Sequence, residues 1–357
     1  MILLPNCEKC TLSGKRVFDT NTEYKPYMII TEKPSVGDIR NNAIMSGNIS
    51  TFARALLGNI KWSDIHWSHI VQCRPPERDP LELEIKCCAD RLSSEIDTIK
   101  PRLLILSGAN VAKLLLDTSL YKSKGQIHKY RGIDTICINS IGAVYNNPEV
   151  ALDLFEDLEW AEQIVTGNFK PLDIDELTKY SIINDEQALL KIFEAFYNQK
   201  VALDIETTGK NIYKDTLRCI GFGNKDHVYI FNHELFTENV KYALSTLSRN
   251  SYLIVHFMDY EYRYLKLRGC DLHISSDTIL KHHCVDERKD PPRSLKYLGR
   301  RYFKVANWAF NVDDSDYSFA DVPDYILHPY LAQDVRLTYM LEELFENHDD
   351  YCGNNSL

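Results

Sequence analysis

Apolar and polar positions in the first half of the chain repeat in two alternating ways. Short apolar runs predict buried strands at 25–32, 66–73, 101–108 and 134–139. Longer segments with helical spacing predict helices at 48–58, 80–99, 109–117 and 150–165. Strands that alternate with helices favour a parallel α/β sheet, because each crossover helix returns the chain to the same end of the sheet.

The second half of the chain predicts a different order of elements. An amphipathic helix at 185–199 precedes an apolar run at 201–209 that ends in a turn with Gly209. A hairpin, a helix, a buried strand and a further helix are predicted at 216–233, 238–249, 251–257 and 259–269. The last helix is expected to begin after Pro329, and the polar tail 348–357 is expected to be frayed.

A polar segment at 166–180, with Gly167 and Pro171, separates these two halves. A chain of 357 residues is long enough for two domains of about 150 residues each. We therefore expect α/β domains at 1–167 and 178–357, joined by a linker at 168–177. The hydrophobic content of 44% and the charged content of 26% indicate ordinary globular domains.

The charge balance restricts the function. With 41 basic and 51 acidic residues, the formal charge is −10, which argues against a protein that coats nucleic acid through bulk positive charge. An enzyme with a local basic channel stays compatible with this balance. Because no apolar run reaches the roughly 18 residues of a membrane span, and the start lacks a basic n-region, we expect an intracellular, cytoplasmic protein.

Cysteines gather near the N-terminus. Of the ten cysteines, five lie in the first 88 residues, and these are Cys7, Cys10, Cys73, Cys87 and Cys88. One C-x-x-C pair with two distant thiols suits an iron–sulfur cluster or a zinc ion. The spacing alone favours such a site no more than it favours scattered buried cysteines.

Carboxylates recur at three places in the second half. Asp204 and Glu206 are two residues apart at a strand end, so their side chains share one face and need cations to offset their repulsion. Tyr330 and Asp334 are four residues apart on a helix and also share a face. Glu261 lies between them in sequence, at a strand–helix junction. Each pattern alone is common by chance, and their order and spacing together are more specific.

In these motifs, residues 175–345 resemble the 3′–5′ exonuclease domain of the DEDDy group found in family A DNA polymerases. The matching segments are Asp204 to Gly209 and Tyr330 to Asp334. The resemblance implies a ribonuclease H-like mixed sheet and two Mg²⁺ or Mn²⁺ ions about 4 Å apart. It also implies hydrolysis at a 3′ end with release of nucleoside 5′-monophosphates, and it leaves single-stranded DNA, a frayed duplex and RNA open as the preferred substrate.

The second motif of the family departs from its usual form. When the motif is aligned on Leu265, Glu261 falls where the family has Asp and Phe257 where it has Asn, with Asp259 as a second candidate. The resemblance implies that Asp204, Glu206 and Asp334 hold the metal ions. Glu261 would assist directly or through water, and Tyr330 would orient the attacking water.

A basic stretch at 288–304 carries interleaved aromatic residues, as expected of a surface that binds single-stranded phosphates and stacks bases. We take its nucleic-acid-binding candidates to be Arg293, Lys296, Arg300 and Arg301. For any one of them, a solvated helix face is an equally good interpretation.

Residues 1–165 resemble the uracil-DNA glycosylase superfamily, nearest to its iron–sulfur family 4. The match includes Cys7-x-x-Cys10, Cys73-Arg74-Pro75-Pro76 and the segment from Glu84 to Cys88. It implies a parallel-sheet α/β sandwich and a [4Fe–4S] cluster held by Cys7, Cys10, Cys73 and Cys88, with Zn²⁺ as the alternative.

The catalytic motifs of this glycosylase family are degraded. Thr31 to Ser35 replaces Gly-Glu-x-Pro-Gly, Ile44 to Gly47 replaces Pro-Phe-x-Gly, and Ser140 to Gly142 replaces His-Pro-Ser. Base excision needs an aromatic stack and polar groups on the departing base. We therefore expect a domain that holds DNA or docks a partner without excising uracil.

The order of the two domains resembles the N-terminal part of certain bacteriophage DNA polymerases. We expect a phage-type, stand-alone 3′–5′ exonuclease that proofreads or degrades DNA, alongside a separate polymerase. Two alternatives stay open: an active uracil-DNA glycosylase with an accessory nuclease domain, and a non-catalytic module that binds DNA or a polymerase.

Overall fold

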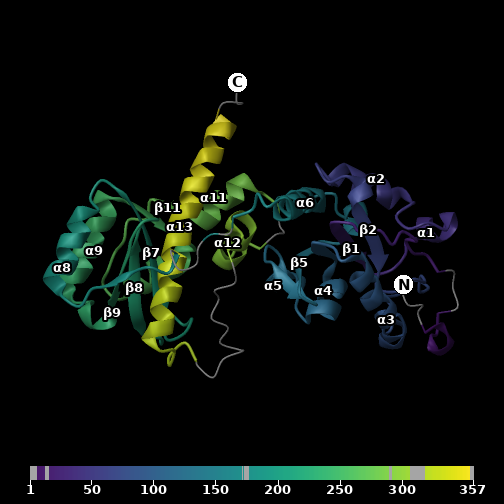
Figure 1. Cartoon of the computed structure of the whole chain (residues 1–357). Helices are drawn as coiled ribbons and strands as arrows, with labels where there is room; N and C mark the ends of the chain where they lie inside the picture. Colours follow the sequence, from purple (N-terminus) through teal and green to yellow (C-terminus); the bar gives the residue numbers. More distant parts are fainter. Residues whose placement is uncertain are drawn as a thin grey trace. The chain divides into compact units, whose positions relative to one another are not determined.

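The computed structural model describes residues 6–12, 16–170, 172, 177–288, 292–305 and 318–353, with side chains described up to residue 346. The chain divides into two compact units, Met1–Pro171 and Leu172–Leu357, each with its own sheet and core (Figure 1). Half of the predicted linker, at 171 and 173–176, and the end of the predicted tail lie outside the described residues. Both units are α/β, as expected.

The N-terminal unit is built on a five-stranded sheet of order β2-β1-β3-β5-β4. Its strands are β1 (Tyr27–Thr31), β2 (Ile65–His69), β3 (Leu103–Ser107), β4 (His128–Tyr130) and β5 (Ile133–Ile138). Four strands are parallel, and β4 pairs with β5 in an antiparallel hairpin. The predicted parallel sheet therefore carries one antiparallel edge strand, which is too short and polar for periodicity to indicate.

Helices cover both faces of this sheet. They are α1 (Val36–Asn41), α2 (Asn48–Leu56), α3 (Glu82–Ile99), α4 (Ala109–Leu116), α5 (Leu120–Ser123) and α6 (Val150–Thr166), with 3₁₀ turns η1 (Cys7–Lys9), η2 (Trp62–Asp64) and η3 (Ile141–Tyr145). Ile29 packs with residues of α2 and α6, whereas Met28 and Ile30 pack with residues of α3 and α4. Burial on both faces explains why the strands read as unbroken apolar runs.

The C-terminal unit has a six-stranded mixed sheet of order β11-β10-β7-β8-β9-β6. Its strands are β6 (Ser181–Ile182), β7 (Lys200–Thr207), β8 (Leu217–Gly223), β9 (Val228–Asn232), β10 (Tyr252–Val255) and β11 (Ser276–Asp277). The antiparallel meander β7-β8-β9 is extended by parallel strands at both edges. This is the ribonuclease H-like arrangement that was expected.

Helices pack on opposite faces of the second sheet. They are α8 (Glu186–Ala195), α9 (Glu238–Asn250), α10 (Met258–Leu267), α11 (Thr278–Val285), α12 (Leu295–Phe303) and α13 (Asp324–Gly353), with the 3₁₀ turn η4 (His233–Leu235). Residues of α8, α9 and α10 share one core with Val201, Leu203 and Ile205 of β7. Residues of α13 share another core with Ala202, and the long helix crosses that face in Figure 1.

Helix α13 begins earlier than the sequence predicts. It starts at Asp324, so Pro329 lies inside the helix and not before it. A proline at this point removes the hydrogen bond that would reach the carbonyl of Tyr325. Because Tyr325 is 72% exposed, water can satisfy that carbonyl and the early start is tolerated.

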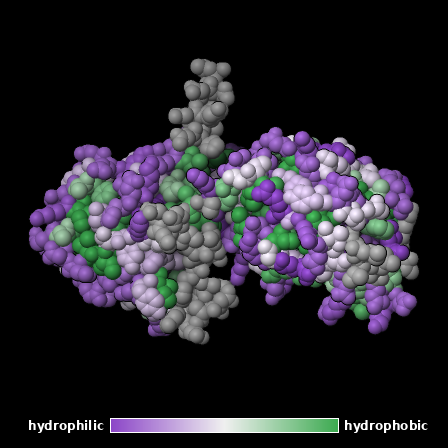
Figure 2. All heavy atoms as spheres, in the orientation of Figure 1, coloured by the Kyte–Doolittle hydropathy of each residue, from purple (hydrophilic) through white to green (hydrophobic). Residues whose placement is uncertain are grey.

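Hydrophilic side chains dominate the surface seen in Figure 2, with apolar patches scattered over both units. Within the described ranges, no helix combines the length and the apolar character needed to cross a membrane.

Candidate active site

Strand β7 brings Asp204 and Glu206 to the α13 face of the sheet. Side chains alternate along a strand, and Val201, Leu203 and Ile205 point into the opposite core. Ala202, which alternates with them, points toward α13. Asp204 and Glu206 follow Ala202 at every second position and therefore point the same way. The parallel partner β10 is paired with β7 only as far as Ala202, so both carboxylates lie beyond the edge of that ladder.

Helix α13 reaches these carboxylates because the neighbouring strand has no side chain in the way. Gly221 of β8 lies directly opposite Asp204 in the antiparallel register. A Cβ atom on Gly221 would lie 2.8 Å from Cγ of Leu331 and 3.0 Å from Cγ2 of Val335. The missing side chain therefore lets α13 lie close against the sheet.

Three carboxylates converge as a result. Asp204, Glu206 and Asp334 each offer a ligand oxygen, and these atoms all lie within 4.8 Å of one another. Asp334 and Glu206 are buried. Such a set of hard oxygen donors suits a divalent cation such as Mg²⁺ or Mn²⁺.

Ionisation of these carboxyl groups is unfavourable in the folded chain. Burial and the nearby charge of Asp334 raise the pKa of Asp204 to about 7. Burial and the charges of Asp204 and Asp334 raise the pKa of Glu206 well above its usual range. These shifts are typical of sites where a cation or a proton must offset crowded carboxylates.

The structure separates the two candidates in the second motif. Glu261 on α10 is only 5% exposed, and among the residues that the structure describes its Oε2 atom has no hydrogen-bond partner. Burial and the charge of Asp204 raise the pKa of Glu261 well above its usual range. The Asp259 side chain, by contrast, is 64% exposed and forms an ion pair with Arg263 at 3.2 Å. Glu261 is therefore the buried acid whose charge interacts with that of Asp204, outside the set of oxygens within 4.8 Å, and Asp259 is exposed.

A neighbouring aspartate, which the sequence analysis did not single out, positions Glu261. Asp277 accepts hydrogen bonds from the backbone N–H groups of Phe257 and Met258 at 3.1 and 2.9 Å. It thereby caps the start of α10, where Phe257 adopts a left-handed conformation with φ of 77°. The signal that could have indicated it is an Asp directly before the helical run that begins at Thr278.

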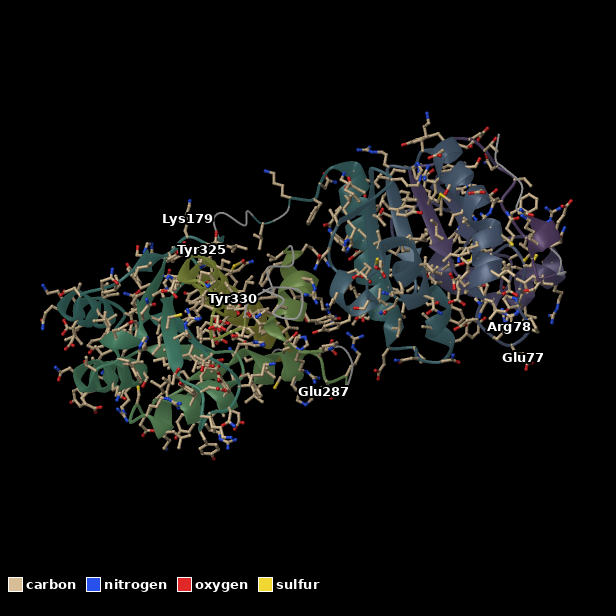
Figure 3. All side chains as sticks on the ribbon, turned by 90° about the horizontal axis from the view of Figure 1, so that it is seen from below. Glu77, Arg78, Lys179, Glu287, Tyr325 and Tyr330 are labelled. Atoms are coloured by element: carbon tan, nitrogen blue, oxygen red, sulfur yellow. The ribbon has the colours of Figure 1, made fainter. Side chains whose placement is uncertain are left out.

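Tyr330 and Lys296 complete the cluster. The ammonium group of Lys296 on α12 donates hydrogen bonds to the Tyr330 hydroxyl and, at 3.0 Å, to Asp334. Burial and the charges of Asp334, Glu206 and Asp204 raise the pKa of Tyr330 well above 10. Figure 3 shows Tyr330 on α13, among the packed side chains of the C-terminal unit.

The other predicted nucleic-acid-binding residues point into the unit. Arg300 is 3% exposed. Arg301 forms an ion pair with Asp286 at 3.1 Å, and Arg293 donates a hydrogen bond to the Asp286 carbonyl at 3.0 Å. Of the four candidates, Lys296 alone lies against the carboxylates. Within the same basic stretch, residues 289–291 lie outside the described part of the chain.

The five N-terminal cysteines line one pocket, together with residues that include Asn6, Arg16 and Gln72. All five are free thiols. Burial and the neighbouring thiols Cys88, Cys7 and Cys10 raise the pKa of Cys73 to about 11. Their place around one pocket is compatible with the predicted thiolate-bound metal centre, and both Cys87 and Cys88 line that pocket.

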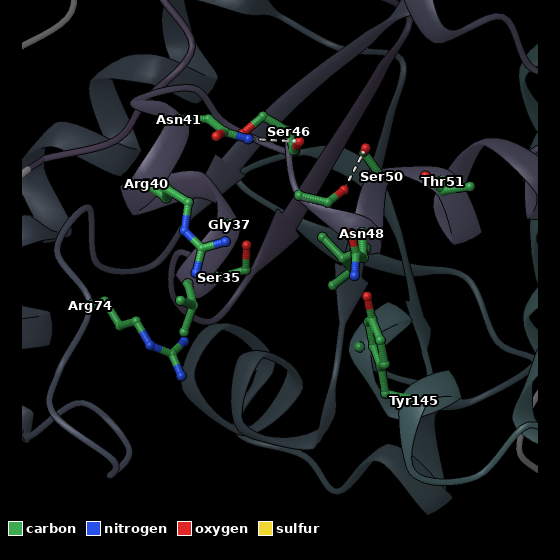
Figure 4. A pocket seen from close by; sticks show the side chains of 14 residues that line it. Ser35, Gly37, Arg40, Asn41, Ser46, Asn48, Ser50, Thr51, Arg74 and Tyr145 are labelled. Atoms are coloured by element: carbon green, nitrogen blue, oxygen red, sulfur yellow. Dashed lines mark hydrogen bonds between the residues drawn. The ribbon is translucent and has the colours of Figure 1, made fainter.

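The degraded glycosylase motifs gather around a second pocket of the same unit (Figure 4). Ser35, Ser46, Gly47 and Gly142 all line it. Glu32, from the first motif, is absent from this lining and lies 3.0 Å from the ammonium group of Lys33.

Two family models match the chain. The 3′–5′ exonuclease model matches residues 180–348, and the uracil DNA glycosylase superfamily model matches residues 19–158. The C-terminal unit is thus a 3′–5′ exonuclease domain, and the N-terminal unit is a domain of the uracil-DNA glycosylase superfamily.

Curated relatives fall into the same two classes. The type-4 uracil-DNA glycosylase of Pyrobaculum aerophilum is 32% identical over 122 residues, which cover 32% of this chain and 62% of that protein. The DNA polymerase of Bacillus phage SP01 is 24% identical over 366 residues, which cover 89% of this chain and 39% of the polymerase. The chain therefore spans less than two thirds of either relative.

Solved structures are similar to about half of this chain. Escherichia coli RNase D aligns with a TM-score of 0.40 and 16% identity, over 49% of this chain and 46% of that one. Brucella melitensis NrnC with bound Mg²⁺ aligns with a TM-score of 0.36 and 17% identity, over 50% of this chain and 84% of that one.

Proposed function

We propose that this protein is a metal-dependent 3′–5′ DNA exonuclease that releases nucleoside 5′-monophosphates. The observation that carries the proposal is the convergence of Asp204, Glu206 and Asp334 within 4.8 Å, in a domain of the 3′–5′ exonuclease family. The raised pKa values of Asp204 and Glu206 support a site that receives positive charge during function.

Each side chain of the cluster has a distinct role in this proposal. Asp204, Glu206 and Asp334 would hold two Mg²⁺ or Mn²⁺ ions, and Glu261 would complete the set through its unpartnered Oε2. The ions would supply Lewis-acid chemistry and a nucleophilic water at neutral pH. Because its pKa lies well above 10, Tyr330 keeps its proton and orients that water by hydrogen bonding.

Lys296 would contribute positive charge at the same place. Its ammonium group contacts both Tyr330 and Asp334, so it lies where a substrate phosphate would approach the cluster. A cation held there favours the extra charge that develops on the phosphate in the transition state. We keep Arg293, Arg300 and Arg301 as weaker candidates for strand binding, since they make internal contacts.

DNA is the proposed substrate because the phage SP01 DNA polymerase aligns with most of this chain. Proofreading or another trimming step in phage DNA replication fits a single-strand 3′ end, alone or frayed from a duplex. A separate DNA polymerase is the proposed partner for that role.

The N-terminal domain is proposed to hold DNA or to dock a partner without excising uracil. Its degraded motifs have Met45 where the glycosylase family has an aromatic residue and Ser140 where it has a histidine, and neither residue lines the pocket. Cys7, Cys10, Cys73 and Cys88 are proposed to hold a [4Fe–4S] cluster, with Zn²⁺ as the alternative.

Digestion of labelled oligonucleotides tests the exonuclease. A 5′-labelled single strand should shorten stepwise from its 3′ end in Mg²⁺ or Mn²⁺ and stay intact in EDTA. Asp204→Ala should slow digestion by at least about a thousand-fold, the loss of several kcal/mol of metal-assisted stabilisation. Lys191→Ala, on the exposed face of α8, is the control and should digest as the parent does.

Digestion by Asp204→Ala at the parental rate would overturn the proposal. DNA binding without metal-dependent turnover would favour the non-catalytic module instead, for which the departures at Phe257 and Glu261 are the supporting feature. A matched RNA strand in the same assay decides between DNA and RNA preference.

A second assay separates the domains. Uracil-containing duplex DNA is incubated with the protein in EDTA and then treated with alkali. Strand breaks at uracil would reveal an active glycosylase and contradict the proposed loss of base excision. Intact strands are the expected result.

A further inference from the structure

The pocket formed by the degraded motifs has its own chemical character. It lies between the start of α1, the start of α2 and η3, and its volume is about 680 Å³ (Figure 4). This volume is in the range that accommodates small ligands, a nucleotide among them.

The charged side chains that line the pocket are all basic. Arg40 and Arg74 are among them, and no acidic residue is, although the chain as a whole has a net charge of −10. Figure 4 shows both guanidinium groups on the same side of the pocket, which they reach from α1 and from the segment after β2. Two guanidinium groups at one polar pocket form the arrangement that recognises phosphate oxygens.

Both arginines keep hydrogen-bonding capacity for a ligand. Arg40 is exposed and has no hydrogen-bond or ion-pair partner in the described part of the chain. Arg74 donates from Nη1 to the carbonyl of Pro34 at 2.9 Å, which orients the group and leaves further N–H donors.

Backbone N–H groups add to the positive electrostatic potential of the pocket. Helix α2 begins after Gly47, which has no side chain to cap it, so the first N–H groups of the helix lack a side-chain acceptor. A Cβ atom on Gly37 would lie 2.5 Å from Cα of Gly47, so these two glycines let α1 approach this helix start. The uncapped end of α2 carries partial positive charge that favours an anion.

Asp38, an acidic residue on the same helix as Arg40, already has hydrogen-bond partners. Asp38 on α1 is buried, and its carboxylate accepts the N–H groups of Ser35 and Ser46 at 2.8 and 2.9 Å. Because it is turned toward the backbone of the pocket wall, it is not among the residues that line the pocket.

An aromatic ring stands beside these groups. Tyr145 lines the pocket, is 50% exposed and packs edge-on against Phe52 with ring centroids 5.0 Å apart. An exposed ring of this kind can stack on a base, whereas a base-excision pocket encloses the base completely.

We propose that this pocket is a nucleotide site that recognises phosphate, with Arg40, Arg74 and the start of α2 on the phosphate and Tyr145 beside the base. The site has exchanged recognition of a flipped base for recognition of an anion. The ligand is the phosphate of a single DNA strand or of a free nucleoside monophosphate. The first of these two alternatives, a DNA strand, rests on the proposed DNA-holding role of this domain. Neither alternative depends on the carboxylate cluster.

Binding measurements on the full chain in EDTA, where the exonuclease is inactive, test the proposal. The probes are dTMP, thymidine, inorganic phosphate and a short oligothymidylate. Arg40→Ala is compared with Arg131→Ala, which removes the same charge from a surface arginine paired with Asp97 at 2.7 Å. We expect Arg40→Ala to weaken binding of a phosphate-bearing probe by at least about ten-fold, and Arg131→Ala to have no effect.

The probes separate the two sources of phosphate. Weakening of dTMP binding supports a free nucleotide, weakening of oligothymidylate binding alone supports the strand, and affinity should fall as salt rises. Thymidine that binds as tightly as dTMP, or equal affinities in the Arg40→Ala and Arg131→Ala proteins, would overturn the proposal. The binding assay runs in EDTA, whereas the digestion assay needs Mg²⁺ and Asp204, so failure of this site and failure of the proposed nuclease are distinguishable.

Discussion

The ammonium nitrogen of Lys296 lies 3.0 Å from a carboxylate oxygen of Asp334, and the same ammonium group contacts the Tyr330 hydroxyl. This contact joins α12 to α13 at the centre of the carboxylate cluster. Lys296 therefore offsets part of the charge that would otherwise oppose folding, and in the proposed function it would bring a fixed cation to the scissile phosphate.

Replacing Lys296 should expose the cost of these buried charges. Lys296→Met leaves the Asp334 carboxylate without this donor, so we expect the metal-free protein to lose about 1–3 kcal/mol of stability. Chemical denaturation in EDTA measures the loss. Mg²⁺ should restore a larger part of the stability in Lys296→Met than in the parent. The exposed control Lys191→Met should change neither quantity, and a Lys296→Met protein as stable as that control would contradict the assigned contact.

The raised pKa of Asp204 predicts how stability depends on pH. The pKa is about 7 in the folded chain and 3.8 in the unfolded chain, so only the folded state holds this proton between those values. The stabilisation is complete below about pH 4 and is lost as the pH rises through about 7. Thermal unfolding in EDTA should therefore show a lower Tm at about pH 8 than at about pH 5.5.

Two comparisons assign this pH effect to the cluster. Asp204→Asn cannot ionise, so in EDTA at about pH 8 it should be more stable than the parent, by about 1 kcal/mol, while being inactive. A divalent cation takes the place of the proton, so Mg²⁺ should raise the Tm of the parent more at high pH than at low pH. An equal Mg²⁺ effect at both pH values would show that these carboxylates do not hold the ion.

The absent side chain at Gly221 should be essential for bringing Asp334 to the strand. A methyl group there would lie 2.8 Å from Cγ of Leu331, so Gly221→Ala should push α13 away and cost about 1–3 kcal/mol. Even a shift of about 1 Å can reduce catalysis by about 100-fold. Denaturation and digestion assays measure the two effects.

Leu331→Ala supplies the matched test of the Gly221 prediction. This change removes two of the three nearest atoms that Gly221→Ala would meet and leaves Cγ2 of Val335, so the double variant should be more stable than the sum of the single effects predicts. If the two changes in the free energy of unfolding are strictly additive, the side chains at positions 221 and 331 do not contact each other.

Glu261 and Asp259 should behave differently although both are acidic residues of the second motif. Glu261→Gln removes a buried carboxylate beside the cluster, and we expect exonuclease activity to fall about 10- to 100-fold. Asp259→Asn changes an exposed carboxylate that pairs with Arg263, and activity should stay within about two-fold. A stronger effect of Asp259→Asn than of Glu261→Gln would reverse the assignment.

The thiol pocket predicts a metal centre with a visible signature. Freshly purified protein should be brown, with broad absorption near about 400 nm and bound iron, if the cysteines hold a [4Fe–4S] cluster. Cys73→Ser should lose the colour and the iron, and Cys284→Ser, an exposed thiol of the other unit, should retain both. A colourless protein with stoichiometric zinc would select the alternative metal.

Cys87 and Cys88 can be resolved in the same experiment. Both line the pocket, and the family alignment selects Cys88 as the ligand. Cys88→Ser should therefore lose more iron than Cys87→Ser, and the reverse order would exchange their roles.

What the sequence determined by itself was the set of elements and the chemistry they carry. Alternating apolar runs and helical segments predicted both α/β units, and the spacing of Asp204 with Glu206 and of Tyr330 with Asp334 predicted two carboxylate-bearing faces. These features are local, because strand and helix periods dictate which side chains share a face. The motif residues also carried both family resemblances.

Only the tertiary structure decided which faces meet and which charges stay unpaired. The approach of α13 to β7 depends on Gly221, about a hundred residues before Leu331, and no local pattern marks that contact. Whether Glu261 or Asp259 faces the cluster depends on how Asp277 caps α10 across the sheet edge. The same holds for the arginines of α12 that point into the unit and for the pocket lined by Arg40 and Arg74. Both arise from packing between distant segments, which the spacing of apolar residues along the chain does not encode.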